Sequence, residues 1–302
     1  MAKARFKKST IVRAAERGVP SLLAAAEHVS PSTAARVAER MWFTVPRSAH
    51  TVRRTLPAGG RPFAVMVQRH VVRGVRWGDG PVVYLVHGWG GELSQLRAFV
   101  APLVAAGHRV VAFDGPSHGA SEAGTSGPGR SDAVALGRAL DAVGARFGQP
   151  AAIVAHSMGA LSSMLALRDG WLSTPRLALI APATDLSTYL DRFFETWRIG
   201  PRSRRRFEER LEHRVGYAVD DFDVARISTD IARPDLLVVH DAGDRSTTYQ
   251  GSVDLVQGWP GARLMTAQGL GHRRVLTDQH VVGEVVSFVT VREATVPSDL
   301  TA

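Results

Sequence analysis

Short apolar runs alternate along the chain with longer stretches in which apolar residues recur at helical spacing. The runs are continuous, which is typical of strands buried on both faces of a sheet. They cover residues 81–86, 109–114, 151–155, 176–180, 236–240 and 262–266. Helices are predicted over 93–106, 131–147, 158–169 and 278–289. This alternation predicts βαβ units and a mostly parallel sheet flanked by helices, which is an α/β fold.

Three stretches depart from this rhythm. Apolar and polar residues alternate over 63–68 and 71–77, which predicts two antiparallel edge strands. Upstream, Ser30 and Pro31 are typical of a helix start, and they predict an accessory helix that runs to about Phe43 and packs on the main body. Downstream, residues 186–197 and 202–215 have helical patterns with no buried-type strand between them.

The composition is that of a globular protein. A chain of 302 residues has ample material for a buried core. Its hydrophobic content is 45% without a run of about eighteen apolar residues, so we expect no membrane-spanning helix. Cysteine is absent, which excludes disulfides, thiolate chemistry and cysteine-ligated metal. We expect neither a metal nor a cofactor.

The net charge is +9, but only three of the 37 basic residues are lysine, and the 34 arginines indicate codon bias. The first 17 residues hold six basic residues against Glu16. Such a tail can touch nucleic acid or an anionic surface, yet no nucleic-acid motif accompanies the charge. We interpret the tail as solvated and expect no nucleic-acid partner. Residues 19–26 are too short an apolar stretch for a signal peptide, so we expect a cytoplasmic protein.

The sharpest chemical feature is a serine between a predicted strand and a predicted helix. The strand over 151–155 leads into Ala155-His156-Ser157-Met158-Gly159. A serine nucleophile must be exposed beside a base, with backbone N–H groups aimed at the developing oxyanion. A sharp turn of this kind meets those needs, and small residues two positions before and after the serine relieve its crowding. The alternative is a strand followed by an ordinary helix that starts at a serine.

This turn resembles the nucleophile elbow of the α/β-hydrolase family, whose usual pattern is Gly-X-Ser-X-Gly; Ala155 departs from it by one methyl group. The resemblance extends to His87-Gly88-Trp89, and it implies an oxyanion hole formed by the N–H groups of Trp89 and Met158. The loop over 114–121 is similar to the Asp-X-Pro-Gly-His-Gly-X-Ser loop of many esterases and lipases. We interpret its Asp114 and His118 as groups that brace the loop.

The resemblance also implies a base and an acid for Ser157. His272 lies in a glycine-rich stretch between the last strand and the last helix, where the family has its catalytic histidine. Asp185, Asp241 and Asp244 are the candidates for the acid. We choose Asp244 because the family's turn commonly reads Gly-X-X-Asp, and Asp241 stands in the place of that glycine.

We therefore predict an α/β-hydrolase fold with three parts: a basic tail and accessory helix (1–50), the core (51–184 and 231–292) and a helical cap insertion (185–230). The predicted function is a serine hydrolase that cleaves a small-molecule ester or thioester through an acyl-enzyme. Trp89, Phe193 and Trp197 are the candidate substrate-binding residues, although the two cap aromatics could equally pack the cap itself. A cofactor-free perhydrolase, a carbon–carbon bond hydrolase and a non-catalytic ligand-binding relative remain alternatives. The patterns do not indicate an oligomeric state.

Overall fold

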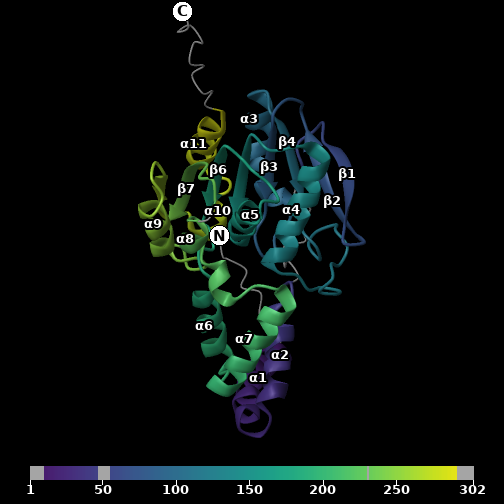
Figure 1. Ribbon diagram of the computed structural model, residues 1–302, viewed down its shortest axis with the longest axis vertical. Coiled ribbons are helices and arrows are strands. Elements are labelled where there is room, and N and C mark those ends of the chain that lie inside the picture. Colours follow the sequence, from purple (N-terminus) through teal and green to yellow (C-terminus); the bar gives the residue numbers. More distant parts are fainter. Residues whose placement is uncertain (1–9, 47–54, 230, 291–302) are drawn as a thin grey trace, which may run out of the picture. The chain divides into compact units, whose positions relative to one another are not determined.

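The computed structural model describes residues 10–46, 55–229 and 231–290. Within them, eight strands form one sheet in the order β1-β2-β4-β3-β5-β6-β7-β8 (Figure 1). The strands are β1 (Arg61–Val67), β2 (His70–Trp77), β3 (Val82–Val86), β4 (Arg109–Phe113), β5 (Ala152–His156), β6 (Arg176–Ile180), β7 (Asp235–Asp241) and β8 (Arg263–Ala267). The pairs β1–β2 and β2–β4 are antiparallel, and the other five pairs are parallel. The predicted mostly parallel sheet is confirmed.

The central strands β3 and β5 are apolar up to His156, the last residue of β5, because helices cover the sheet on both faces. Every residue of β3 and β5 is buried. In register, Val83 to Val86 of β3 lie beside Ala152 to Ala155 of β5. Parallel strands end at the same edge of a sheet, so the residues that follow β3, β5 and β7 are brought together there.

The helices are α1 (Thr10–Val29), α2 (Pro31–Trp42), α3 (Val100–Ala105), α4 (Ala133–Phe147), α5 (Met158–Arg168), α6 (Leu186–Trp197), α7 (Pro201–Val215), α8 (Val224–Ile227), α9 (Tyr249–Gln257), α10 (Gly271–Arg274) and α11 (Gln279–Thr290), with 3₁₀ segments η1 (Leu93–Phe99) and η2 (Val219–Phe222). One face of the sheet packs against η1, α3 and α11 in a single apolar cluster. On the other face α5 contacts β3 and β5, and α4 packs on α5 (Figure 1).

The helix predicted over 93–106 is two elements, η1 and α3. Pro102 has no N–H to donate to the carbonyl of residue 98, and its ring clashes with an α-helical turn before it. The α-helix α3 therefore starts at Val100, after the 3₁₀ segment. This start places Pro102 in the first turn, where the missing N–H donor costs little.

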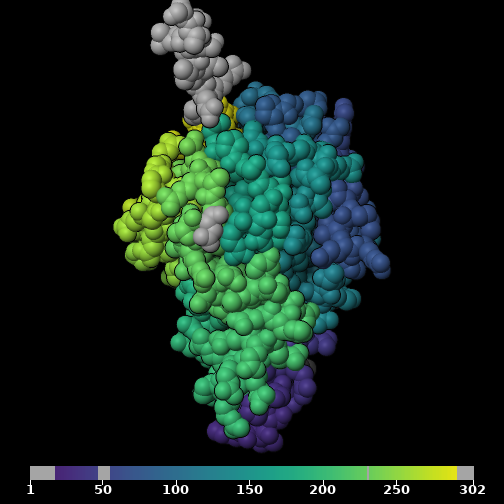
Figure 2. All heavy atoms as spheres, viewed as in Figure 1, coloured from purple at the N-terminus to yellow at the C-terminus, as the bar shows by residue number. Residues whose placement is uncertain are grey.

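Among the described residues, 10–44 and 185–223 form a second compact unit, which we call the helical unit. Helix α2, the accessory helix that we expected to pack on the main body, contacts α1 and α7 within this unit. In Figure 2 the green atoms of α7 lie against the purple atoms of the N-terminal segment. Helix α1 was not predicted: residues 10–17 read as tail, and Pro20 interrupts the helical pattern. Burial of Leu23 in the apolar cluster of this unit stabilises the helix despite Pro20.

Two buried carboxylates join the N-terminal helices to α7 inside the helical unit. Glu27 accepts hydrogen bonds from the backbone N–H groups of Arg202 (2.8 Å) and Ser203 (3.0 Å), so it caps the first turn of α7 from a distant part of the chain. Glu39 accepts from Arg210 and Arg214. Neither carboxylate stood out in the sequence, because each acts through a partner more than 170 positions away.

Candidate active site

Ser157 lies at the turn between β5 and α5, as the sequence pattern predicts. Its backbone has φ 55° and ψ −123°, a conformation that a residue with a side chain adopts only where its surroundings impose it. Here the Ser157 N–H donates to the carbonyl of Ile180 (3.1 Å), and the Ser157 carbonyl accepts from Ala183 N–H (3.1 Å). A Cβ on Gly159 would lie 2.5 Å from the carbonyl oxygen of His87, so this position requires glycine. The turn therefore holds its serine at the carboxyl edge of the sheet.

His272 and Asp244 complete a chain of hydrogen bonds from Ser157. Nε2 of His272, in the short helix α10, lies 3.0 Å from Ser157 Oγ. Nδ1 of the same ring lies 2.8 Å from Asp244 Oδ2. The Asp244 side chain is fully buried, whereas that of His272 is 17% exposed. The structure thus brings together the three side chains that we chose from the sequence.

The other two candidate acids have different contacts. Asp241 accepts hydrogen bonds from the N–H groups of Leu270 (2.6 Å) and Gly243 (2.8 Å), so it fastens the histidine loop to the end of β7. Asp185 caps α6, accepting from Ser187 N–H (2.8 Å) and Thr188 N–H (3.2 Å). Asp241, which stands in the place of the family's glycine, therefore holds the loop that carries His272 by a hydrogen bond.

Hydrogen bonds keep Asp244 ionised. Burial alone would raise the pKa of this carboxyl, but hydrogen bonds from His240, His272 and the Ser246 N–H lower the pKa well below its usual value. A carboxylate only accepts hydrogen bonds, so Nδ1 of His272 carries the proton and Nε2 presents a lone pair to Ser157. This arrangement can take the serine proton and hold the resulting imidazolium beside a negative charge.

The loop after β3 approaches Ser157 closely. A Cβ on Gly88 would lie 2.7 Å from the Cβ of Ser157, so only glycine permits this approach. Among the described residues, neither the N–H of Trp89 nor that of Met158 donates to a protein acceptor. Met158 is the first residue of α5, where the helix itself leaves N–H groups without partners. Both predicted oxyanion donors therefore belong to segments that meet at Ser157.

Two buried histidines brace this loop against the loop that follows β4. His118 Nε2 accepts from Gly90 N–H (3.1 Å), and its Nδ1–H donates to Pro116 O (2.9 Å). His87 Nε2 accepts from Gly115 N–H (2.9 Å) in the same way. Asp114 accepts from the N–H groups of Leu93 (2.7 Å) and Ala120 (2.8 Å). Asp114 and His118 thus brace the loop, as we interpreted them, and His87 contributes a brace that the sequence did not reveal.

Burial of three histidines near Ser157 keeps them neutral. It lowers the pKa of His87 to about 4, and those of His118 and His156 to about 3. His156, next to the serine, donates from Nε2 to the carbonyl of His272 (2.9 Å) and so ties the elbow to the histidine loop. Burial raises the pKa of Asp114 to about 6.

These pKa values predict a loss of stability in mild acid. In the unfolded chain the three histidines regain ordinary pKa values near 6.5, so the unfolded state binds more protons from pH 6.5 down to about 4. Each histidine then lowers the free energy of unfolding by up to about 1.4 kcal/mol per pH unit. Asp114 offsets part of this, because its raised pKa favours protonation of the folded state. We expect the free energy of unfolding in urea to be roughly 4 kcal/mol lower at pH 5 than at pH 7. Equal free energies of unfolding at pH 5 and pH 7 would contradict the lowered pKa values of the three histidines.

Phe193 and Trp197 lie on α6 in the helical unit, partly exposed at the edge of its apolar cluster. The ring of Phe193 contacts Trp42 with centroids 5.2 Å apart and Phe207 at 6.0 Å. Packing within the unit therefore accounts for part of each surface, as in the alternative that we kept open. Trp89, the third candidate substrate-binding residue, meets His118 edge to face with centroids 5.4 Å apart.

Within the described residues, no group of three or more His, Asp or Glu side chains has the arrangement of a metal site. In the same part of the chain no helix is long and apolar enough to cross a membrane. Several polar residues near Asp244 were not predicted, namely His240, Thr247 and Ser252. The available signal was the placement of His240 at the end of a buried strand, four positions before Asp244.

A family model described as "Alpha/beta hydrolase family" matches residues 83–286. Among solved structures, a putative lipase from Acinetobacter baumannii AYE is 16% identical over 77% of this chain and 91% of its own, with a TM-score of 0.61. The thioesterase domain from the curacin biosynthetic pathway is 16% identical over 77% and 99%, with a TM-score of 0.57. A bacterial membrane phospholipase A is 17% identical over 92% and 95%, with a TM-score of 0.59. No curated protein matches the chain.

Proposed function

The chain belongs to the alpha/beta hydrolase family and has its fold, and we propose that it is a serine hydrolase that cleaves carboxylic ester or thioester bonds through an acyl-enzyme. One observation carries the proposal: the side chains of Ser157, His272 and Asp244 form an unbroken chain of hydrogen bonds at a turn of unusual backbone conformation. Family membership supports a hydrolase, and these residues supply the chemistry.

In the first half of the proposed reaction, His272 Nε2 takes the Ser157 proton while Oγ attacks the carbonyl carbon. The carbonyl oxygen becomes an oxyanion that accepts hydrogen bonds from the Trp89 and Met158 N–H groups. Collapse of this intermediate breaks the bond to the leaving alcohol or thiol, which receives the proton from His272. Asp244 stabilises the imidazolium throughout without taking a proton itself.

In the second half, water attacks the acyl carbon and gives its proton to His272. The Oγ–carbon bond then breaks, the carboxylic acid leaves, and the proton returns to Ser157. A serine in this position argues against dehalogenase and epoxide hydrolase chemistry, since those relatives form their ester intermediate on an aspartate. The intact hydrogen-bond chain argues against a non-catalytic relative.

The leaving group separates the remaining alternatives. We expect hydrolysis of short p-nitrophenyl esters and of the matching thioesters. A perhydrolase would use hydrogen peroxide in place of water as the second nucleophile, and a carbon–carbon bond hydrolase would need a ketone substrate. A panel that compares esters, thioesters and β-diketones, each with and without peroxide, distinguishes these classes. Turnover confined to β-diketones would contradict the ester and thioester proposal.

We further propose that Phe193, Trp197 and Trp89 are substrate-binding residues. Phe193→Ala or Trp197→Ala should then change the ratio of kcat/KM between butyl and octyl esters by about tenfold, since a few methylene groups lose contacts of roughly 0.8 kcal/mol each. Phe207→Ala is the matched control, because Phe207 is fully buried in the same cluster. It should lower the melting temperature and leave the ratio unchanged. If Phe193→Ala and Trp197→Ala leave the ratio of kcat/KM between the two esters unchanged, the role of Phe193 and Trp197 is packing alone.

A further inference from the structure

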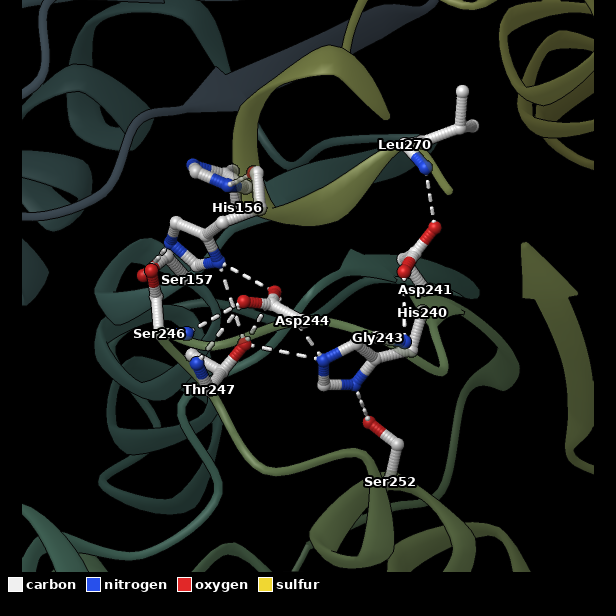
Figure 3. A network of polar contacts seen from close by, with 11 residues as sticks. His156, Ser157, His240, Asp241, Gly243, Asp244, Ser246, Thr247, Ser252 and Leu270 are labelled. Carbon is white, nitrogen blue, oxygen red and sulfur yellow. Dashed lines mark hydrogen bonds and ion pairs between the residues drawn. The ribbon is translucent and has the colours of Figure 1, made fainter. Parts of the chain in front are cut away.

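Asp244 has a second set of polar partners that its contact with His272 does not require. Thr247 Oγ1 lies 2.9 Å from Asp244 Oδ2, the same oxygen that faces His272. His240, at the end of β7, places its Nε2 3.1 Å from Thr247 Oγ1 and 3.5 Å from Asp244 Oδ2. Nδ1 of His240 lies 2.7 Å from Ser252 Oγ in α9. Figure 3 shows Thr247 and His240 approaching the carboxylate as one connected group.

With neutral imidazoles, the directions of the hydrogen bonds in this group follow from the ionised carboxylate of Asp244. The ionised carboxylate only accepts, so Thr247 must donate its single hydroxyl proton to Oδ2. Thr247 Oγ1 then accepts, and the neighbouring donor is Nε2–H of His240. This leaves Nδ1 of His240 as an acceptor for the Ser252 hydroxyl. The 3.3 Å approach of Thr247 Oγ1 to His272 Nδ1 follows because both donate to one oxygen.

Burial makes these protein donors necessary. His240 and Ser252 have no exposed surface, and Thr247 is 3% exposed. The Asp244 side chain is also fully buried, so water does not replace a donor that is removed. The other carboxylate oxygen, Oδ1, accepts from the N–H groups of Ser246 (2.7 Å) and Thr247 (3.4 Å). The carboxylate is therefore held through both oxygens, and its orientation toward His272 is fixed.

We propose that Thr247 and His240 are positioning residues for the triad, with Ser252 anchoring the imidazole of His240. They hold Oδ2 of Asp244 where it accepts from His272 Nδ1–H, and they act only through Asp244. This inference rests on the proposed serine hydrolase function. It also assigns His240 no role as an alternative base, because its Nε2 carries a proton and faces the acid, while its Nδ1 is occupied by Ser252.

Thr247→Val tests the proposal with little change of shape. Valine fills the same volume but removes the hydroxyl, so Asp244 loses one donor and Nε2–H of His240 loses its acceptor. We expect kcat for a short p-nitrophenyl ester to fall about tenfold with KM unchanged, as for the loss of one hydrogen bond to a charged group. Thr247→Ser keeps the hydroxyl and should return kcat to within about twofold of wild type. Thr248→Val is the matched control, since the side chain of that exposed neighbour makes no cap hydrogen bond.

A double-mutant cycle distinguishes positioning from a general packing effect. If Thr247 acts through Asp244, then Thr247→Val in an Asp244→Asn background should lower kcat by less than about twofold further. If the two residues acted independently, the two fold losses in kcat would multiply. His240→Leu removes the Nε2–H that donates to Thr247 Oγ1 and should lower kcat at least as much as Thr247→Val. His240→Gln keeps an N–H near the Nε2 position and should lower kcat by less. If the His240 variants do not fold, the Thr247 series alone still decides the question.

The wild-type protein, measured alongside, separates this inference from the function on which it rests. No esterase or thioesterase turnover by wild type would overturn both. Turnover by wild type, with Thr247→Val at the wild-type kcat, would overturn the positioning role only. A tenfold loss that serine does not restore, or that multiplies with Asp244→Asn, would also overturn it, because the loss would then come from packing.

Discussion

Replacement of Ser157 by alanine is expected to reduce kcat for a small activated ester by about 10⁶, and His272→Ala by a similar factor, as for catalytic groups that act as one unit. Without Oγ there is no nucleophile to form the acyl-enzyme. Without the imidazole the hydroxyl keeps its proton and is a poor nucleophile in water. Steady-state hydrolysis of p-nitrophenyl acetate, with an active-site titration of the wild type, measures both losses.

Matched variants show whether these losses are specific. Ser162→Ala removes a buried hydroxyl in α5, the helix that follows Ser157, and this hydroxyl has no hydrogen-bond partner among the described residues. His280→Ala removes an exposed imidazole near the start of α11. Both should retain the wild-type kcat, and all four variants should unfold cooperatively. A folded Ser157→Ala or His272→Ala protein with more than about a tenth of wild-type turnover would exclude that residue from the mechanism proposed here.

Asp244→Asn is expected to reduce kcat by about 10⁴. An amide in this position can donate to Nδ1 of His272, which then presents a protonated Nε2 to Ser157 instead of a lone pair. The imidazolium formed during the reaction also loses its negative partner. The distance of 2.8 Å between Asp244 Oδ2 and His272 Nδ1 makes this the carboxylate whose neutralisation matters most.

Asp241→Asn and Asp185→Asn are the parallel tests. Asparagine at 241 keeps one acceptor for the N–H groups of Leu270 and Gly243, so a loss of no more than about tenfold in kcat is expected. Asparagine at 185 is itself a good helix cap and should leave kcat unchanged. A loss of about 10⁴ at either of these positions, with Asp244→Asn active, would move the acid to that position.

The parallel sheet was predictable because burial on both faces leaves a direct mark on the sequence. Strands β3 and β5 are apolar except for His156 at the end of β5, and each is followed by residues that carry the proposed chemistry. Ser157 was found in the same way, since the crowding at the turn leaves Ala155 and Gly159 as a local signature. His272 and Asp244 needed the family resemblance, because their proximity to Ser157 depends on the order of strands in the sheet.

Features set by distant contacts were not predictable. Helix α1 contains Pro20 and starts within the stretch that we interpreted as a basic tail, and packing on α2 and α6 stabilises it. The capping of α7 by Glu27 and the brace by His87 likewise join segments that no local pattern connects. The group formed by His240, Thr247 and Ser252 depends on the turn after β7, where the side chains of a strand, a loop and a helix meet at one carboxylate.

Labelling with a fluorophosphonate, followed by intact mass and peptide mapping, tests the central claim most directly. The reagent phosphonylates a serine only where a base activates it and an oxyanion hole receives the phosphoryl oxygen. We predict one adduct per chain on the peptide that contains Ser157, no adduct in Ser157→Ala, and strongly slowed labelling in His272→Ala. A folded wild-type protein that takes up no label, or that takes it up on another residue, would contradict the assignment of Ser157 as the nucleophile.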